Sequence, residues 1–428
     1  MLDKLFLQLE KITPARYRWV WNHEGFRRYF ANTGWMFFGQ IFSLILSFFI
    51  GAWLARYLGP TNYGIINYTV AFAGLFGFIA TLGVDAILVR ELVKNPEKRD
   101  ELMGTSFVLK LIGGVVALLL VTVAAFAFET STLNRLFIII FSFGFITQSV
   151  NVIYHYFQAE VRAKYNSLSQ LAATIATNVL KIVFILVEAD LVWIIIIFAA
   201  DSVWQTLFFL YYYKRQGLKL STWKFNKSLA KQILAGSKYL MLSAAAAFVL
   251  FKIDQVMIGR LLGEGAVGLY AAAAKFGEIW YFLPGILCAS LFPAIINSRT
   301  VSETLFKQRL INFYTLMFVI SILIATATSV LARPVVLLLF GQDYAASVGL
   351  LQIYVWSGVG LFMAWAIQQR LTAEDRMKAI SNAYLVAMVI NVILNYFFIT
   401  RFGLTGAAWA TLIAYSLLPV MMMGRKRR

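Results

Sequence analysis

The chain of 428 residues is 61% apolar and only 14% charged, and it carries a formal net charge of +18. Soluble domains carry about 25% charged residues, so this composition and the mean hydropathy of +0.75 exclude a water-soluble fold. The single cysteine, Cys288, cannot form an internal disulfide, and the two histidines, His23 and His155, do not make a zinc-binding pattern. We therefore predict neither a metal site nor a cofactor.

The first 32 residues combine six basic side chains with interleaved apolar and aromatic ones. No short apolar core precedes a small-residue cleavage site, so the segment does not resemble a signal peptide. Its pattern is typical of a helix that lies on the membrane surface, and we assign residues 1–32 to the cytoplasmic face.

Twelve apolar runs follow, each about as long as the ~20 residues that a spanning helix needs. Because the backbone must satisfy its own hydrogen bonds in hydrocarbon, these runs are expected to be helices. The fold class is therefore predicted to be an all-α integral membrane protein. The spans are expected near 33–57, 64–88, 104–128, 135–157, 168–187, 191–213, 237–261, 267–293, 310–332, 347–370, 378–399 and 403–424.

The longest connection, 214–236, mixes lysines with Trp, Phe and Leu, as an interfacial amphipathic linker would. It divides the chain into a lobe of six spans at 33–213 and a second lobe of six spans at 237–424, with a basic tail at 425–428. No connection is long enough to hold a separate catalytic domain.

The basic residues are distributed unequally over the two sides of the membrane. With a cytoplasmic N-terminus, 28 of the 38 lysines and arginines fall on the cytoplasmic side, which also makes the C-terminus cytoplasmic. Topology thus accounts for most of the positive charge, and no nucleic-acid partner is predicted. Five arginines fall outside, namely Arg56, Arg135, Arg260, Arg333 and Arg401, and five lysines lie within or at the edge of spans, namely Lys110, Lys181, Lys238, Lys252 and Lys275.

The two halves also share sequence. ARYLGPTNYG at 55–64 aligns without gaps with GRLLGEGAVG at 259–268, and NVLKIVFILVEADL at 178–191 aligns with NVILNYFFITRFGL at 391–404. We interpret each half as a copy of one six-helix unit. Because six is even, both copies enter from the same side, so a pseudo-two-fold axis along the membrane normal should relate them.

The stretch WLARYLGPTNYGIINYTVAFAGLFGFIATLGVDAILVRE resembles the first two helices of the polysaccharide-biosynthesis flippases, the Wzx-type members of the multidrug/oligosaccharidyl-lipid/polysaccharide exporter superfamily. The resemblance runs from residue 33 to the C-terminus. Further matches are FQAEVRAKY (157–165), KIDQVMIGRLLGEGAVGLYAAAAKF (252–276), LFP (291–293), LLFGQDYAAS (338–347) and LNYFFITRFGLTGAAWATLIAYS (394–416).

This resemblance implies two six-helix lobes facing a central cavity. It also implies a cargo, an undecaprenyl-diphosphate-linked oligosaccharide such as an O-antigen or exopolysaccharide repeat unit, which moves from the cytoplasmic to the outer leaflet. The expected location is the plasma membrane of a bacterium or archaeon. The expected partners are this substrate, membrane lipids and other polysaccharide-assembly proteins, and the chain is expected to act as a monomer.

Charged residues inside spans are costly and indicate possible function. Lys275 and Glu278, three residues apart, could pair with each other, either as a structural ion pair or as a pair that lines the cavity. Lys252 and Asp254 lie about 200° apart on one helix, so they cannot both face one cavity, and Asp254 could instead meet Lys275. Lys181 and Asp201 lie at similar depth on adjacent helices and could form a buried ion pair or serve the cargo.

Other candidates lie toward the ends of spans. Arg56 and Arg260, which match in the repeat, could hold a diphosphate or anchor lipid headgroups. Asn67 shares a polar helix face with Asp85. Lys110 is expected to extend to the cytoplasmic surface.

The chain has no nucleotide-binding loop of the GxxxxGK[ST] kind, so energy is expected from an ion or the membrane potential. Candidate coupling residues are Asp85, Asp201, Asp254 and Glu278. Two alternatives stay open: a cation-coupled multidrug exporter of the same superfamily, and a membrane-embedded polysaccharide polymerase or ligase. The short external loops argue against an enzyme.

Overall fold

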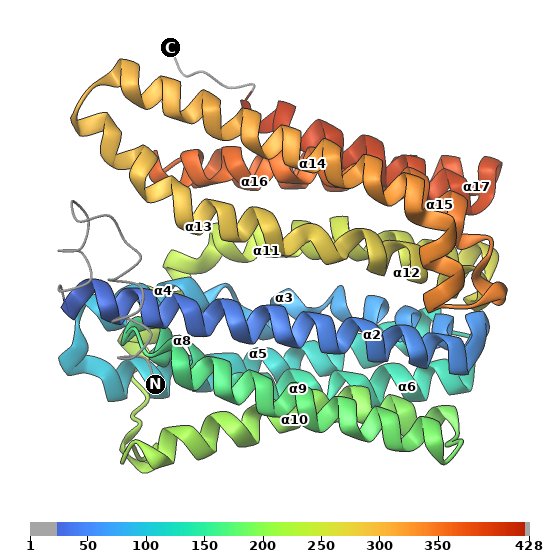
Figure 1. Cartoon of the computed structure of the whole chain (residues 1–428). Helices are drawn as coiled ribbons and strands as arrows, with labels where there is room; N and C mark the ends of the chain where they lie inside the picture. Colours follow the sequence, from blue (N-terminus) through green and yellow to red (C-terminus); the bar gives the residue numbers. More distant parts are fainter. Residues whose placement is uncertain (1–23, 424–428) are drawn as a thin grey trace, which may run out of the picture.

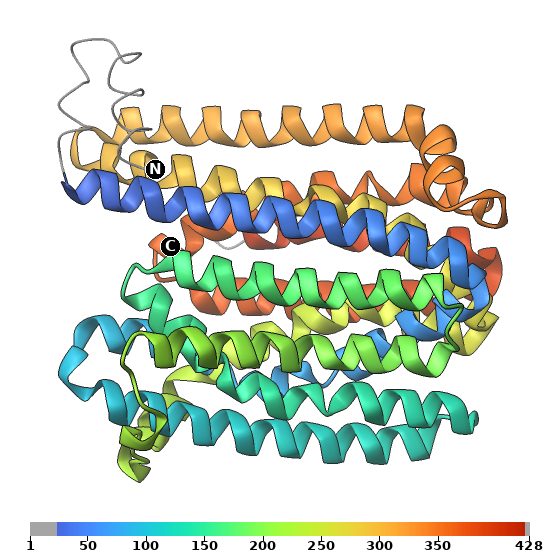
Figure 2. The same cartoon turned by 60° about the horizontal axis from the view of Figure 1, so that its bottom comes forward.

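The computed structural model describes residues 24–423. Residues 1–23 of the surface segment expected at 1–32, which include His23, and the basic tail 425–428 therefore lie outside the described residues. Within 24–423 every regular element is helical. The helices run roughly along one common axis in both views (Figure 1 and Figure 2), so the long apolar runs form a bundle as predicted.

Helices α2 to α10 form the first lobe, which occupies the lower half of Figure 1. The α-helices of this lobe are α2 (Glu24–Gly74), α3 (Gly77–Thr81), α4 (Val84–Lys94), α5 (Arg99–Phe128), α6 (Thr132–Ser142), α7 (Gly144–Thr147), α8 (Val152–Ala159), α9 (Ala163–Leu186) and α10 (Leu191–Arg215). Short 3-10 turns η2 (Pro96–Lys98) and η3 (Gln148–Asn151) join some of them.

Helices α11 to α17 form the second lobe, in the upper half of Figure 1. They are α11 (Lys227–Leu262), α12 (Glu264–Glu278), α13 (Phe282–Asn297), α14 (Glu303–Leu339), α15 (Ser347–Tyr354), α16 (Ser357–Ala373) and α17 (Met377–Met423). The 3-10 turns are η5 (Ile279–Tyr281), η6 (Ser298–Thr300) and η7 (Gln342–Tyr344), and η4 (Leu220–Thr222) lies in the connection between the lobes.

Ten helical segments of the described chain are long and apolar enough to cross a membrane. Two of them contain a non-helical glycine, Gly59 with φ 69° in α2 and Gly403 with φ 61° in α17. The 47 residues of α17 would extend about 70 Å if straight, more than twice the ~30 Å hydrocarbon layer. The chain therefore reverses direction at each of these two glycines, and α2 and α17 each cross the membrane twice. The ten segments thus provide the twelve predicted passes.

These two reversals differ from the expected geometry. The expected spans left residues 58–63 and 400–402 between successive helices. The structure instead keeps helix up to and after a single glycine, because only glycine adopts a positive φ without strain.

The connections at the two ends of the bundle differ in charge. The connections 95–98, 160–162, 216–226, 298–302 and 374–376 each contain Lys or Arg, and we name this side the basic end. The connections at the opposite end are 59, 129–131, 187–190, 263, 340–346 and 403. They contain no Lys or Arg but four acids, Glu129, Glu188, Asp190 and Asp343.

The connection between the lobes is attached to α5 of the first lobe. The Lys224 amide donates to the Asp100 carbonyl at 3.1 Å, and the Asn226 amide donates to Thr105 Oγ1 at 3.0 Å. The Asn226 side chain then accepts from the amides of Ser228 and Leu229, which caps the start of α11. The first helix of the second lobe thus starts from a fixed position.

The two repeat motifs pack directly against each other where the lobes meet. A Cβ added to Gly64 would lie 1.7 Å from the Glu264 carbonyl oxygen, and one added to Gly268 would lie 1.9 Å from the Pro60 carbonyl oxygen. Gly64 and Pro60 are the repeat equivalents of Gly268 and Glu264, so the contact is reciprocal, as two-fold symmetry requires. The lobes are related by a pseudo-two-fold axis along the membrane normal, and small residues allow the close approach.

Candidate functional site

Lys252 of α11 and Glu278 at the end of α12 form an ion pair inside the helix bundle. The Lys252 Nζ atom lies 3.7 Å from Glu278 Oε2, and Tyr354 at the end of α15 donates its hydroxyl to Glu278 Oε1 at 3.0 Å. The predicted pairing of Glu278 with Lys275 is therefore wrong. Both side chains remain about one-third exposed, so the pair borders accessible space rather than sealed core.

Asp254 faces other helices of the second lobe. Its carboxylate accepts a hydrogen bond from the Tyr270 hydroxyl at 2.6 Å and another from the Thr411 hydroxyl at 3.5 Å, and it is 2% exposed. The suggested contact with Lys275 is absent among the described side chains. Measured from Gly263 at ~1.5 Å per residue, Asp254 is about 14 Å deep, close to Tyr270 at about 11 Å, whereas Lys275 is about 18 Å deep.

Lys275 extends from the second lobe toward the first. A Cβ added to Gly51 of α2 would lie 2.5 Å from the Lys275 Nζ atom, so this ammonium lies against the bare backbone of α2. No described carboxylate forms an ion pair with it. Lys275 also interacts electrostatically with Lys181 on α9, so two partly buried cations from different lobes act on each other.

Lys181 and Asp201 do not form the suggested ion pair in the described part of the chain. The Lys181 Nζ atom lies 4.2 Å from the centre of the Phe198 ring, in a cation–π contact. Asp201 accepts a hydrogen bond from Thr177 at 2.7 Å and acts on Lys181 only through its longer-range charge. We name Lys181 and Lys275 the lysine pair.

In the first lobe, Asp85 is held by a lysine and a histidine near the basic end. Lys110 Nζ lies 2.6 Å and His155 Nε2 lies 3.1 Å from Asp85 Oδ1. Lys110 is only 2% exposed, so the expectation that it extends to the surface is wrong: its carboxylate partner keeps it inside. Asn67 donates to the Tyr63 carbonyl one turn earlier on α2, at 2.8 Å, an ordinary contact within a helix.

At the opposite end, side-chain contacts join the lobes. Arg260 Nε lies 3.5 Å from Glu129 Oε1, and Glu129 also accepts a hydrogen bond from Tyr68. Asn134 donates to Glu264 at 3.0 Å. These contacts close the bundle on this side.

Arg56 and Arg260 lie at the same end but in different surroundings. Arg56 lies beside Gly341 and has no ion-pair partner among the described residues, whereas Arg260 is engaged by Glu129. The equal pair of guanidinium groups suggested by the repeat is therefore not formed in this conformation.

A cavity of about 620 Å³ lies between the lobes toward the basic end. It is lined from the first lobe by α2, α8 and α9, and from the second lobe by α13, α16 and the η5 turn. None of its residues was a candidate from the sequence. The lining residues are Phe37, Gln40, Tyr154, Gln158, Ala163, Asn166, Ser167, Gln170, Tyr281, Phe282, Gly285, Ile286, Ala289, Ser290 and Trp365.

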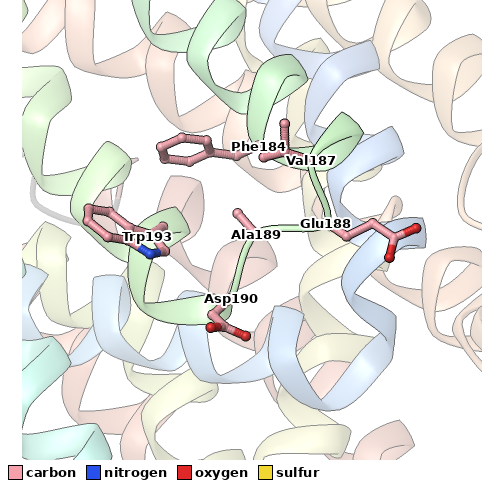
Figure 3. Close-up of a pocket in the computed structure, with 6 residues that line it drawn as sticks. All are labelled: Phe184, Val187, Glu188, Ala189, Asp190 and Trp193. Atoms are coloured by element: carbon pink, nitrogen blue, oxygen red, sulfur yellow. The ribbon is translucent and has the colours of Figure 1, made fainter.

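A second hollow, of about 520 Å³, lies at the tip of the first lobe, where α9 turns into α10. Figure 3 shows the Phe184 and Trp193 rings on one side of this turn and the Glu188 carboxylate directed to the other. The two rings meet edge-to-face with centroids 6.3 Å apart. Because the hollow belongs to one helix pair and not to the lobe interface, it does not lie on a path between the lobes.

Two solved structures have the same fold. An inward-facing multidrug resistance transporter of the MATE family matches with a TM-score of 0.72 at 17% identity, covering 88% of this chain and 92% of that one. The lipid II flippase MurJ, in an inward closed conformation, matches with a TM-score of 0.67 at 18% identity, covering 90% and 86%. At these identities the likeness concerns the fold alone.

Two relatives match over most of their length. A Shigella flexneri protein named "Putative O-antigen transporter" is 21% identical over 88% of this chain and 92% of its own. The Haloferax volcanii protein named "Probable low-salt glycan biosynthesis flippase Agl15" is 21% identical over 90% of this chain and 81% of its own. Residues 29–299, more than half of the chain, match the profile described as polysaccharide biosynthesis protein. The chain is a multi-pass membrane protein and belongs to the polysaccharide biosynthesis protein family.

Proposed function

We propose that the protein is a flippase that moves an undecaprenyl-diphosphate-linked oligosaccharide from the cytoplasmic to the outer leaflet by alternating access. The observation that carries the proposal is the lysine pair. Two ammonium groups in a poorly solvated interior repel each other, and an anion between them relieves that repulsion. A diphosphate supplies this anion, and the names of the relatives support a glycan as the rest of the cargo.

The two ends of the bundle support alternating access. The opposite end is joined by Arg260–Glu129 and Asn134–Glu264, while the cavity lies toward the basic end. Movement of the lobes about the reciprocal glycine contact would exchange these two states. We propose that the chain does this as a monomer, alongside other polysaccharide-assembly proteins.

The driving force is proposed to be a coupling cation or the membrane potential. Asp254 is the best candidate, since the hydroxyl groups of Tyr270 and Thr411, which a cation can replace, hold its carboxylate. Asp201 is similarly held by Thr177. Glu278 and Asp85 are weaker candidates, because Lys252 and Lys110 already form ion pairs with them.

Complementation is the direct test. In a strain that lacks its own flippase and makes a matching glycan, expression of this chain should restore surface polysaccharide, measured by blotting or glycan staining. The rival function, drug export, is measured in the same strain as resistance to cationic dyes. Restored drug resistance without surface glycan, at normal protein levels, would replace our proposal with the rival.

The basic end is proposed to be cytoplasmic, with both termini on that side, because loops rich in Lys and Arg stay on the cytoplasmic side of a membrane. In a Cys288→Ser background, Glu188→Cys should react with an impermeant maleimide in intact cells. Ser221→Cys, in the connection between the lobes, should react only after permeabilisation. Both positions are exposed. The reverse labelling pattern would invert the topology.

A further inference from the structure

We propose that the cavity toward the basic end is a subsite for the uncharged glycan portion of the cargo, separate from the lysines that meet the diphosphate. This inference rests on the proposed function and assigns one part of the substrate to one part of the protein. Its evidence is the chemistry of the lining, which differs from that of the rest of the basic end.

None of the fifteen residues that line the cavity carries a formal charge. This is unusual at an end whose connections each contain Lys or Arg. The polar groups in the lining are amides and hydroxyls, contributed by Gln40, Gln158, Asn166, Ser167, Gln170 and Ser290. A neutral polar lining favours a neutral polar ligand, and it offers no ion pair to an anion or a cationic drug.

Three of these amides are available to a ligand. Among the described residues, none donates to or accepts from the side chains of Gln40, Gln158 or Gln170. Each amide offers two donor hydrogens and an acceptor oxygen, which match the donor and acceptor character of a sugar hydroxyl.

A fourth amide is held in place by the protein. Asn166 is 6% exposed and donates to the Tyr154 carbonyl at 2.9 Å, while its own oxygen has no partner within the described structure. An unmade hydrogen bond at a buried group is costly, so a ligand or water that reaches this oxygen is stabilised.

Aromatic side chains from both lobes supply the apolar part of the lining. Phe37 and Tyr154 belong to the first lobe, and Tyr281, Phe282 and Trp365 belong to the second. Such rings stack against the C–H faces of pyranose sugars, while Tyr and Trp retain a polar group for hydrogen bonding.

Trp365 is held against a neighbouring helix. A Cβ added to Gly285 of α13 would lie 3.4 Å from the edge of the Trp365 ring, so the bare backbone gives the ring a close contact. The cavity volume of about 620 Å³ lies within the ~300–1,000 Å³ of ordinary ligand sites.

The position of the cavity suits a cargo in which a neutral glycan is joined to the lipid through a charged diphosphate. Tyr281 lines the cavity and lies in the η5 turn directly after Glu278, the ion-pair partner of Lys252. On α9, Gln170 is followed by Lys181 eleven residues later, about 17 Å deeper along the helix. Sugars in the cavity would therefore leave the diphosphate near the lysines.

The test compares two probes on the full-length protein in detergent micelles. One is the lipid-linked oligosaccharide purified from a flippase-deficient strain that accumulates it, and the other is undecaprenyl diphosphate without sugar. Gln170→Leu and Trp365→Leu should weaken the Kd of the glycan-bearing lipid by about 5- to 10-fold, roughly the loss of one or two net hydrogen-bond or stacking contacts, and leave that of the sugar-free lipid unchanged. The sugar-free probe also reports whether each variant is folded.

Two further variants act as controls. Lys275→Gln should weaken both probes, because both carry the diphosphate. Trp53→Leu, at an exposed tryptophan outside the cavity lining, should weaken neither.

The remaining outcomes overturn the inference in distinguishable ways. If the cavity variants affect both probes equally, or neither, the glycan subsite is wrong while the flippase proposal stands. If the wild-type protein binds neither probe but binds a cationic dye, the proposed function fails, and the subsite fails with it.

Discussion

Replacing Lys275 by Gln is expected to lower export of lipid-linked glycan at least about ten-fold at equal protein levels. Two unit charges at 4 Å gain ~4 kcal/mol at an effective dielectric constant near 20, against ~1 in water, and 1.4 kcal/mol corresponds to a factor of ten. Folding should be unaffected, since no described carboxylate loses an ion-pair partner. Lys275→Arg should recover part of the activity because it keeps the charge. The measurement is surface polysaccharide in the complemented strain.

Lys252 requires a different design because Glu278 depends on it. Lys252→Gln alone leaves that carboxylate with only the Tyr354 hydroxyl, so reduced export could reflect damage to the protein. The double variant Lys252→Gln/Glu278→Gln removes both charges and separates the two causes. If the double variant folds normally but exports poorly, Lys252 acts on the cargo.

The matched control for both lysines is Lys238→Gln. This lysine lies on α11 as Lys252 does, but it is exposed near the basic end. It should export normally, and none of these variants should change drug resistance. Normal export by Lys275→Gln and by the Lys252/Glu278 double variant would move the diphosphate site to Lys181, Arg56 or Arg260.

Gly64→Ala is expected to cause the largest loss of stability of any single methyl addition considered. The new Cβ would lie 1.7 Å from the Glu264 carbonyl oxygen, and this backbone atom cannot move aside unless the lobes separate. Overpacking a tight core costs ~1–3 kcal/mol, more where backbone must shift. We expect a clear loss of folded protein, measured by thermal unfolding with fluorescence-detected size exclusion.

The equivalent glycine in the second repeat gives a second destabilising variant, and a glycine in α15 gives the control. Gly268→Ala should be destabilised to a similar degree, because its Cβ would lie 1.9 Å from the Pro60 carbonyl oxygen in the reciprocal contact. Gly349→Ala in α15 has nothing within 4 Å of the added Cβ and should be neutral or slightly stabilised. A Gly64→Ala protein as stable as wild type would show that the lobes do not touch there.

The sequence by itself determined the helices, their number of passes and their division into two repeats. Long apolar runs must be helical in hydrocarbon, because no water satisfies the backbone. The matched motifs around Gly64 and Gly268 identified the repeat, and the structure brings these motifs into reciprocal contact. Each of these features is visible in short stretches of sequence, and none requires knowing which stretches meet in space.

Only the tertiary structure decided which charges meet. Lys275 is three residues from Glu278, yet Glu278 pairs with Lys252, which projects from a neighbouring helix. Asp85, Lys110 and His155 come together from three helices that the sequence does not align. Which side chains pair depends on the depth and rotation of each helix in the bundle, and the spacing of residues along the sequence does not specify either.

The amide-lined cavity was also decided by tertiary packing. A search for costly charges inside spans finds Lys275 but passes over Gln170 and Asn166, because neutral amides carry a smaller insertion penalty and give no strong signal. These side chains define a site only when α9 of one lobe lies opposite α13 and α16 of the other. A binding cavity is a property of surfaces brought together from distant parts of the chain, so the physical origin of this site lies in the packing of the two lobes.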